Sequence, residues 1–193
     1  MKYRTILLFG APGSGKGTQG KILGAIPGWF HCSCGEVFRS LRPDSELGRT
    51  FLQYSSKGEL VPDEFTVTLW RDFIGKSIAA GRFHPETDTL VLDGLPRNLH
   101  QSQILSDTLE VVTMIYLVCR DMDKLVARLQ RRALHENRLD DANLDTIRRR
   151  FATYERETQP VLDFYGKKLV RRVNATRPPI AVQLSILKLI QRL

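Results

Sequence analysis

The sequence lacks several features that would place it in common protein classes. It has only three cysteines in 193 residues, too few for a disulfide framework, and reduced thiols of this kind predict a cytoplasmic protein. No apolar run approaches the ~20 residues that a membrane-spanning helix requires. The first apolar run begins too near the N-terminus to follow a cleavable signal peptide. We therefore expect neither export nor contact with a membrane.

Three ligand-binding patterns are missing as well. His31, Cys32 and Cys34 lie close together, but no second Cys or His pair lies nearby to complete a zinc site. No N-K-x-D segment is present to read guanine, which argues against a GTP-dependent switch. No basic segment is interleaved with aromatic residues for stacking on nucleic acid. The net charge of +8 therefore favours small, phosphate-bearing ligands.

The composition that is present is that of a folded protein, 42% hydrophobic and 26% charged. Short apolar runs alternate with amphipathic segments, which predicts an α/β fold with a doubly wound parallel sheet. We expect strands at residues 3–9, 29–32, 89–92, 111–118 and 169–173. We expect helices at residues 19–23, 33–41, 44–57, 62–80, 122–133, 144–165 and 180–193, with an irregular segment at residues 134–143.

The stretch from Gly10 to Thr18 reads G-A-P-G-S-G-K-G-T and joins the first strand to a helix. A G-x-x-x-x-G-K turn in this position is the phosphate-binding loop, whose backbone N–H groups point into one concavity. The helix N-terminus adds partial positive charge, and Lys16 adds a full charge for the β- and γ-phosphates. Gly17 stands where Ser or Thr is usual, so the hydroxyl comes one residue later, at Thr18.

Charged and amide side chains follow the strand that ends at Asp93. A carboxylate at this point is expected to associate with magnesium in phosphate-loop enzymes. Arg97 projects from the following turn and can fork onto a phosphate, while Gln101 can both donate to and accept from a base. Arg39, at the end of a short helix, is either a second phosphate ligand or half of a surface ion pair.

A set of arginines brackets the irregular segment. Arg128 and Arg132 share a helix face, and Arg138 and Arg150 lie on either side of two aspartates. A solvated basic helix would give this pattern, and so would a lid that closes over a transferring phosphoryl group and neutralises its charge.

Five motifs occur together in one order and spacing: G-x-P-G-S-G-K-G-T, H-x-S-x-G-E-x-x-R, L-V-P-D-E, D-G-x-P-R-N-x-x-Q and R-x-D-D. In this the chain resembles the nucleoside monophosphate kinases, and most closely the adenylate kinases with a short lid. The resemblance covers almost the whole chain. It implies a five-stranded core at residues 1–33, 62–132 and 142–193, a monophosphate-binding insert at 34–61, and a lid at 133–141.

The resemblance also implies roles for individual residues. ATP would be held by Gly13, Ser14, Gly15, Lys16, Gly17, Thr18, Arg128, Arg132 and Arg177. AMP would be held by Cys34, Arg39, Glu59, Leu60, Val61, Gly94, Arg97, Gln101, Arg138 and Arg150. The catalytic set would be Lys16, Arg97, Arg132, Arg138 and Arg150, with Arg149 a rival for the last position. Mg²⁺ would enter with ATP, held by Asp93 through water, with Thr18 as a second candidate.

Two positions depart from the adenylate kinase pattern. Cys34 replaces a Thr in the adenine pocket, and Glu36 replaces an Asp. Cytidylate and uridylate kinases resemble this segment too, but they generally lack the Gln at position 101. The lid contains no Cys, which excludes the zinc-binding long-lid form. We predict a monomer that converts ATP and AMP into two ADP; the alternatives are a CMP/UMP kinase and a nucleotide-binding regulator, against which the arginine set argues.

Overall fold

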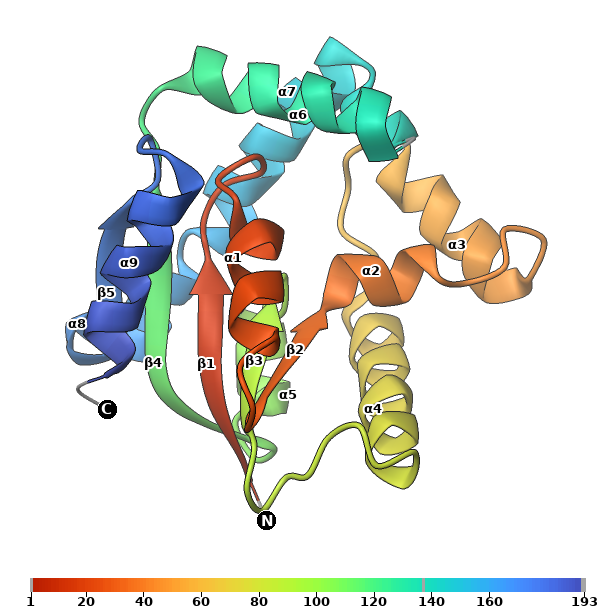
Figure 1. Cartoon of the computed structure of the whole chain (residues 1–193). Helices are drawn as coiled ribbons and strands as arrows, with labels where there is room; N and C mark the ends of the chain where they lie inside the picture. The colour runs from red at the N-terminus through yellow and green to blue at the C-terminus, as the bar shows by residue number, and fades with distance from the viewer. Residues whose placement is uncertain (1, 137, 192–193) are drawn as a thin grey trace.

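The computed structural model describes residues 2–136 and 138–191. Its centre is a five-stranded parallel sheet in the order β2-β3-β1-β4-β5. The strands are β1 (Tyr3–Phe9), β2 (Trp29–Ser33), β3 (Thr89–Asp93), β4 (Leu109–Val118) and β5 (Val170–Asn174) (Figure 1). The predicted α/β class with a doubly wound parallel sheet is confirmed. Only the start of β4 differs noticeably from the prediction, because the strand begins at Leu109 rather than at residue 111.

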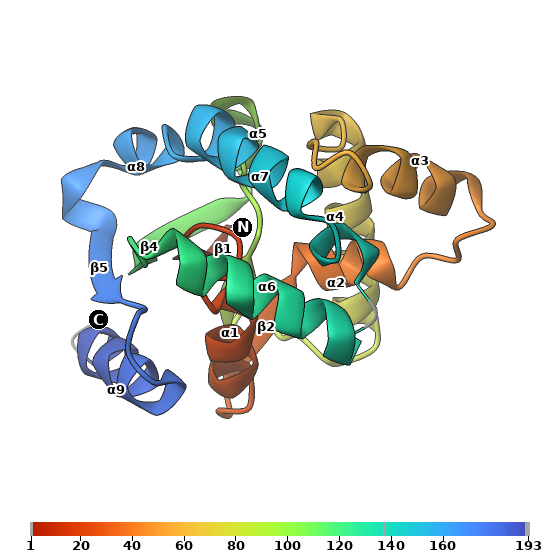
Figure 2. The same cartoon turned by 90° about the horizontal axis from the view of Figure 1, so that it is seen from above.

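Helices cover both faces of this sheet and its upper edge (Figures 1 and 2). The α-helices are α1 (Lys16–Gly24), α2 (Cys34–Arg39), α3 (Glu46–Ser55), α4 (Asp63–Ala79), α5 (Leu99–Leu105), α6 (Met122–Glu136), α7 (Leu144–Thr153), α8 (Val161–Leu169) and α9 (Pro179–Ile190). A 3₁₀ turn, η1 (Leu139–Asp141), follows α6, and a π-helical turn, η2 (Tyr154–Thr158), follows α7. None of the helices in the described part of the chain has the length and apolar composition to cross a bilayer.

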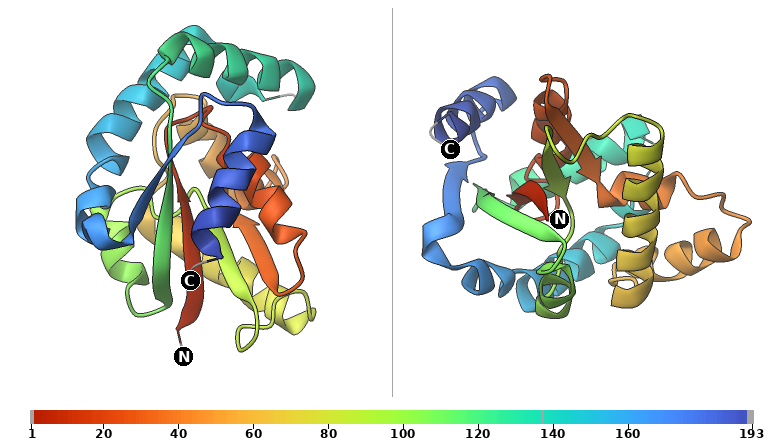
Figure 3. Two further views of the ribbon diagram at one scale, coloured as in Figure 1. Left: turned by 60° about the vertical axis from the view of Figure 1, so that its left-hand side comes forward. Right: turned by 90° about the horizontal axis from the view of Figure 1, so that it is seen from below.

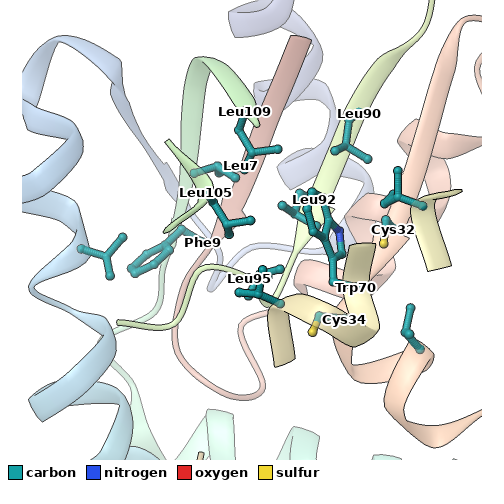
Figure 4. Close-up of a cluster of buried hydrophobic side chains, with 14 of the residues drawn as sticks. Leu7, Phe9, Cys32, Cys34, Trp70, Leu90, Leu92, Leu95, Leu105 and Leu109 are labelled. Carbon is teal, nitrogen blue, oxygen red and sulfur yellow. The ribbon is translucent and has the colours of Figure 1, made fainter. Parts of the chain in front are cut away.

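The central strand β1 is buried on both faces because its apolar side chains alternate between two cores. Ile6 and Leu8 face a core that α1 and α9 close. Leu7 and Phe9 face a second core, which α4, α5 and α8 close. Figure 4 shows this second core, where Trp70 of α4 lies beside β3. The alternation fixes the register of the sheet, since a slip by one residue would exchange the two sets.

The helices α6 and α7 lie above the carboxyl ends of the strands, as the left view of Figure 3 shows for α6. They are held together by a small apolar cluster in which Leu125 and Leu129 of α6 meet Ile147 and Phe151 of α7. In parallel sheets, ligands bind outside the carboxyl ends of the strands. The two helices therefore cover, as a roof, the edge of the sheet at which a ligand is expected.

Two predicted boundaries near this roof were wrong. The predicted irregular segment at 134–143 is helical at its start, because α6 continues to Glu136; Leu134 and Glu136 are good helix formers and extend the helix that precedes them. The single helix predicted for residues 144–165 is divided into α7, η2 and α8. Pro160 is the reason that α8 starts anew, because proline donates no backbone hydrogen bond.

Candidate active site

The phosphate loop spans the turn between β1 and α1. Gly15 is the N-cap of α1 with φ of 96°, and Gly13 has φ of 79°. A Cβ atom on Gly13 would lie 2.8 Å from the carbonyl oxygen of Leu125, so only glycine fits beneath α6. The backbone of this loop can therefore approach a phosphate closely, with the N-terminus of α1 directed at it.

Lys16 is held inside the loop by its own backbone. The Nζ atom donates to the carbonyl oxygens of Gly10, at 2.7 Å, and of Ala11, at 3.2 Å. Burial lowers the pKa of Lys16 from 10.5 to about 8, an effect that the nearby Asp93 carboxylate opposes and that the surrounding arginines reinforce. The ammonium group thus lies in a cationic site that would be stabilised by an anion.

Asp93 ends β3 directly beside this loop. Its residue is 6% exposed, and it pairs in register with Leu8 of β1 and Ser33 of β2. A Cβ atom on Gly17 would lie 3.7 Å from its Oδ2 atom. Carboxylate and hydroxyl oxygens suit Mg²⁺, which proteins usually hold through one or two carboxylates together with substrate phosphates. The Asp93 carboxylate and the Thr18 hydroxyl, both lining the same cavity, fit that requirement.

Arg132 of α6 and Arg150 of α7 are fixed by one buried carboxylate. Asp141 is fully buried and accepts from Arg132, whose Nη2 atom lies 2.6 Å away, and from Arg150. Arg150 also lies 2.8 Å from Asp140. Burial lowers the pKa of Arg150, and the two aspartates oppose this effect. Both guanidinium groups are therefore held at the roof of the site before any ligand arrives.

The remaining arginines lie around the same space. Arg138 pairs with Glu136 at 2.6 Å, and Arg128 donates to the carbonyl oxygen of Ala175 at 2.9 Å. Arg39 lies over Gly35, where an added Cβ atom would come within 3.1 Å of both its Nη atoms. Burial lowers the pKa of Arg39 to about 10, and the charge of Arg138 adds to the effect.

Arg97 and Gln101 are joined to each other at the start of α5. The Nε atom of Arg97 donates to the carbonyl oxygen of Gly94 at 2.8 Å, which folds the guanidinium back over the turn. The backbone N–H of Arg97 donates to Oε1 of Gln101 at 2.7 Å. Gln101 is 1% exposed, and Asn98 caps the helix by accepting from its backbone N–H at 2.8 Å.

One cavity of about 890 Å³ is lined by the phosphate loop, by Asp93 and Gln101, and by these arginines. Every site residue that the sequence predicted lines it, from the phosphate loop at one end to Cys34, Glu59, Leu60 and Val61 at the other. Arg150 lines this cavity, whereas Arg149, its rival in the sequence analysis, is exposed. Arg177 lines the cavity beyond β5. The structure thus brings the predicted residues together; their roles remain predictions.

Comparison with known proteins agrees with this geometry. A family model described as adenylate kinase matches residues 8–170. The chain is 36% identical to an adenylate kinase of Thermobifida fusca over 180 residues, 90% of each chain. It is 34% identical to one of Porphyromonas gingivalis, over 86% of this chain and 84% of the other. It is 32% identical to adenylate kinase isoenzyme 1 of Rattus norvegicus, over 90% and 87%.

The chain belongs to the adenylate kinase family. The predicted family and enzyme class are confirmed. Adenylate kinases transfer a phosphoryl group from ATP to AMP, and the comparisons favour this reaction over the CMP/UMP kinase and over a regulator without turnover.

Sequence reasoning missed several residues that line the adenylate kinase cavity. Phe38 and Phe51 stack with their ring centroids 5.0 Å apart, and both line the cavity. Thr66 of α4 and Tyr154 of η2 line it as well. Phe51 follows the apolar face of α3, so the helical periodicity could have identified it. The same holds for Tyr154, which follows Ile147 and Phe151 on one helical face and begins the π turn.

The predicted departure at Cys34 lies where the acceptor base is expected. Cys34 is 2% exposed and begins α2, and a Cβ atom on Gly94 would lie 3.9 Å from its own Cβ atom. Burial raises the pKa of the thiol to about 11. The residue therefore presents a neutral thiol, a weak hydrogen-bonding group, to the cavity.

Proposed function

We propose that the residues of this cavity catalyse ATP + AMP ⇌ 2 ADP by direct in-line phosphoryl transfer. The observation that carries the proposal is that one cavity is lined both by the phosphate loop and by Arg39, Arg97, Arg132, Arg138 and Arg150. In the proposed mechanism, ATP and AMP bind at opposite ends of this cavity with their phosphates adjacent. Transfer then requires positioning and charge stabilisation rather than a covalent enzyme intermediate.

The donor end is the phosphate loop. Backbone N–H groups from Gly13 to Thr18 would hold the β- and γ-phosphates, and Lys16 would move from its carbonyl partners to the phosphate oxygens. Arg128 and Arg177 would lie against the donor nucleoside. Mg²⁺ bound with ATP would neutralise phosphate charge, and Asp93 would hold it through water, with Thr18 as the second oxygen ligand.

The acceptor end lies between α2 and α5. Arg39 and Arg97 would bind the AMP phosphate, while the residues from Glu59 to Val61, with Cys34, Gly94 and Gln101, would enclose the base. The AMP phosphate is already an anion at neutral pH, so no general base is needed to activate it. Insert 34–61 would carry most of this end and move as a unit.

The arginines at the roof would act on the transferring group. Arg132, Arg138 and Arg150 would neutralise the charge that builds on the equatorial oxygens, and lid 133–141 would exclude water. Asp141 would hold two of these guanidinium groups in place, so that little reorganisation is needed during the reaction. We further propose that the protein acts as a cytoplasmic monomer, because one chain supplies every group that the mechanism uses, and that it requires no nucleic acid.

A second candidate, a kinase of CMP or UMP, is favoured by one observation only, the Cys34 thiol in the acceptor pocket. The test is ADP formation from ATP–Mg²⁺ with AMP, CMP, UMP or GMP as the sole acceptor, followed by a coupled assay. We expect rapid turnover with AMP. Preference for CMP or UMP would keep the mechanism and replace the acceptor, and binding of ATP without turnover on any acceptor would contradict the proposal.

A further inference from the structure

Asp63, the first residue of α4, joins that helix to the start of α5 through side chains alone. Its Oδ1 atom accepts from Nε2 of Gln101 at 2.7 Å and from Nδ2 of Asn98 at 2.9 Å. Its Oδ2 atom lies 2.9 Å from Nδ1 of His100. Asp63 does not line the cavity. Its hydrogen bond to Gln101 nevertheless connects it to the acceptor end.

The side-chain amide of Gln101 is held at both ends by groups that can act in only one way. The backbone N–H of Arg97 can only donate, and it donates to Oε1. An ionised carboxylate can only accept, and Asp63 accepts from Nε2. Turning the amide over would set two donors against each other at Arg97 and two acceptors against each other at Asp63. The orientation of the amide is therefore determined by its partners.

Asp63 remains ionised under ordinary conditions. Its partial burial acts to raise the pKa of the carboxyl, but the hydrogen bonds from His100, Asn98 and Gln101 outweigh this and hold it below its usual value. The carboxylate is thus an acceptor throughout the neutral range.

The fixed amide has one N–H and one oxygen lone pair left over, side by side. Adenine presents a donor, N6–H, next to an acceptor, N1, so it complements that pair. Hypoxanthine, guanine and uracil present an oxo acceptor next to an N–H donor, which is the reverse. In the proposed function Arg39 and Arg97, which line the same cavity, hold the phosphate, so a base anchored through it cannot turn over to correct the mismatch.

We propose that Asp63 is a positioning residue that fixes the Gln101 amide and thereby makes the acceptor site select 6-amino over 6-oxo bases. The inference rests on the proposed function, because it needs AMP in the acceptor site. Asp63 itself touches no substrate in this scheme. It acts by removing the alternative orientation of a side chain that does.

The substitution that tests this is Asp63→Asn, which keeps the shape and gives Gln101 a partner that can either donate or accept. One of the two restraints on the amide is then lost. The ratio of kcat/KM for AMP to kcat/KM for IMP should fall about tenfold, the size expected when one buried mismatch is relieved. The change should appear mainly as a higher KM for AMP and a lower KM for IMP, while KM for ATP stays the same.

A matched control lies next to Asp63 in the chain. Glu64 is exposed and also occupies the first turn of α4, so Glu64→Gln removes the same charge from the helix N-terminus without touching Gln101. It should leave the AMP to IMP ratio unchanged. Asp63→Ser, whose hydroxyl both donates and accepts, should reproduce the effect of Asp63→Asn and serves if that variant does not fold.

The outcomes separate this inference from the proposed function. Turnover of AMP by the wild type, with a ratio that falls in the Asp63 variants and not in Glu64→Gln, supports both. Turnover of AMP with an unchanged ratio in the Asp63 variants overturns the role of Asp63 and leaves the proposed function standing. An equal fall in Glu64→Gln also overturns it, because the effect would then come from helix charge. No turnover of AMP by the wild type overturns the proposed function and this inference with it.

Discussion

Replacing Lys16 with Met should abolish activity and stabilise the ligand-free protein. Methionine matches the length of the lysine side chain but carries no charge, so packing in the phosphate loop changes little. The lowering of the pKa of Lys16 from 10.5 to about 8 corresponds to about 3 kcal/mol of unfavourable free energy for holding the charge in the folded protein. Two effects reduce the gain in stability on substitution: solvent screens the charge of the partly buried Lys16, and methionine cannot make the hydrogen bonds to the carbonyl oxygens of Gly10 and Ala11.

We therefore expect the free energy of unfolding of Lys16→Met to exceed that of the wild type by about 1–2 kcal/mol at pH 7. For a chain of 193 residues, this is a rise of about 3–6 °C in Tm. Chemical and thermal unfolding of both proteins without nucleotide measure the difference. Lys188→Met, at an exposed position of α9, is the control for removing one positive charge from the surface.

The difference in stability between Lys16→Met and the wild type should change with pH in one direction. Below about pH 8 Lys16 is charged in the folded and unfolded protein alike, so the penalty is constant. Between about pH 8 and 10.5 the folded protein loses the proton while the unfolded chain keeps it, so this group adds stability to the wild type as pH rises. The advantage of Lys16→Met should shrink across that window. A less stable variant at pH 7, or parallel curves from pH 7 to 10, would refute the reasoning.

Three further outcomes follow from the site. Arg150→Ala should lower kcat by a factor of about 100 or more, whereas Arg149→Ala, at an exposed position, should leave it nearly unchanged in the coupled assay. Asp141→Asn removes the fully buried negative charge that pairs with two guanidinium groups. It should lower the free energy of unfolding by about 3 kcal/mol in denaturant melts. At pH 7 a thiol reagent should modify Cys119 and spare Cys34, whose pKa is raised to about 11 by burial; mass spectrometry of the folded protein would reveal early labelling of Cys34 if this is wrong.

The parts of the fold that the sequence predicted well depend on local patterns. The strand before Gly10 and the strand that ends at Asp93 are short, apolar and bounded by turns, so their positions and ends follow from neighbours in the chain. The phosphate loop is similarly local, because its glycines, Lys16 and the helix N-terminus are consecutive. These residues line the cavity because the carboxyl ends of parallel strands meet at one edge of a sheet.

The parts that were missed depend on contacts between distant segments. Asp63 meets Gln101 across 38 positions, and nothing in the periodicity of α4 indicates that its first residue reaches α5. Arg149 and Arg150 are equivalent in the sequence, and only the direction of α7 against α6 puts Arg150 in the cavity. The π turn at Tyr154 likewise follows no local pattern that could be distinguished from an α-helix.

The positive charge of the molecule has a specific use in this account. The pKa of Lys16 and the pKa of Arg150 are both lowered by burial, and the arginine charges around Lys16 lower its pKa further. The ligand-free site thus holds charge that the fold alone does not favour, and Asp141 offsets part of it. Two highly anionic nucleotides are the kind of ligand that would neutralise the remaining positive charge.

The central claim is that phosphate passes directly from ATP to AMP inside one cavity. It is tested most directly by the stereochemistry at phosphorus, with ATP whose γ-thiophosphate is made chiral by oxygen isotopes and AMP as acceptor. A single in-line displacement predicts that the thiophosphate reaches AMP with inverted configuration. Retention of configuration would require two displacements through an intermediate carried by the protein, and would contradict the account.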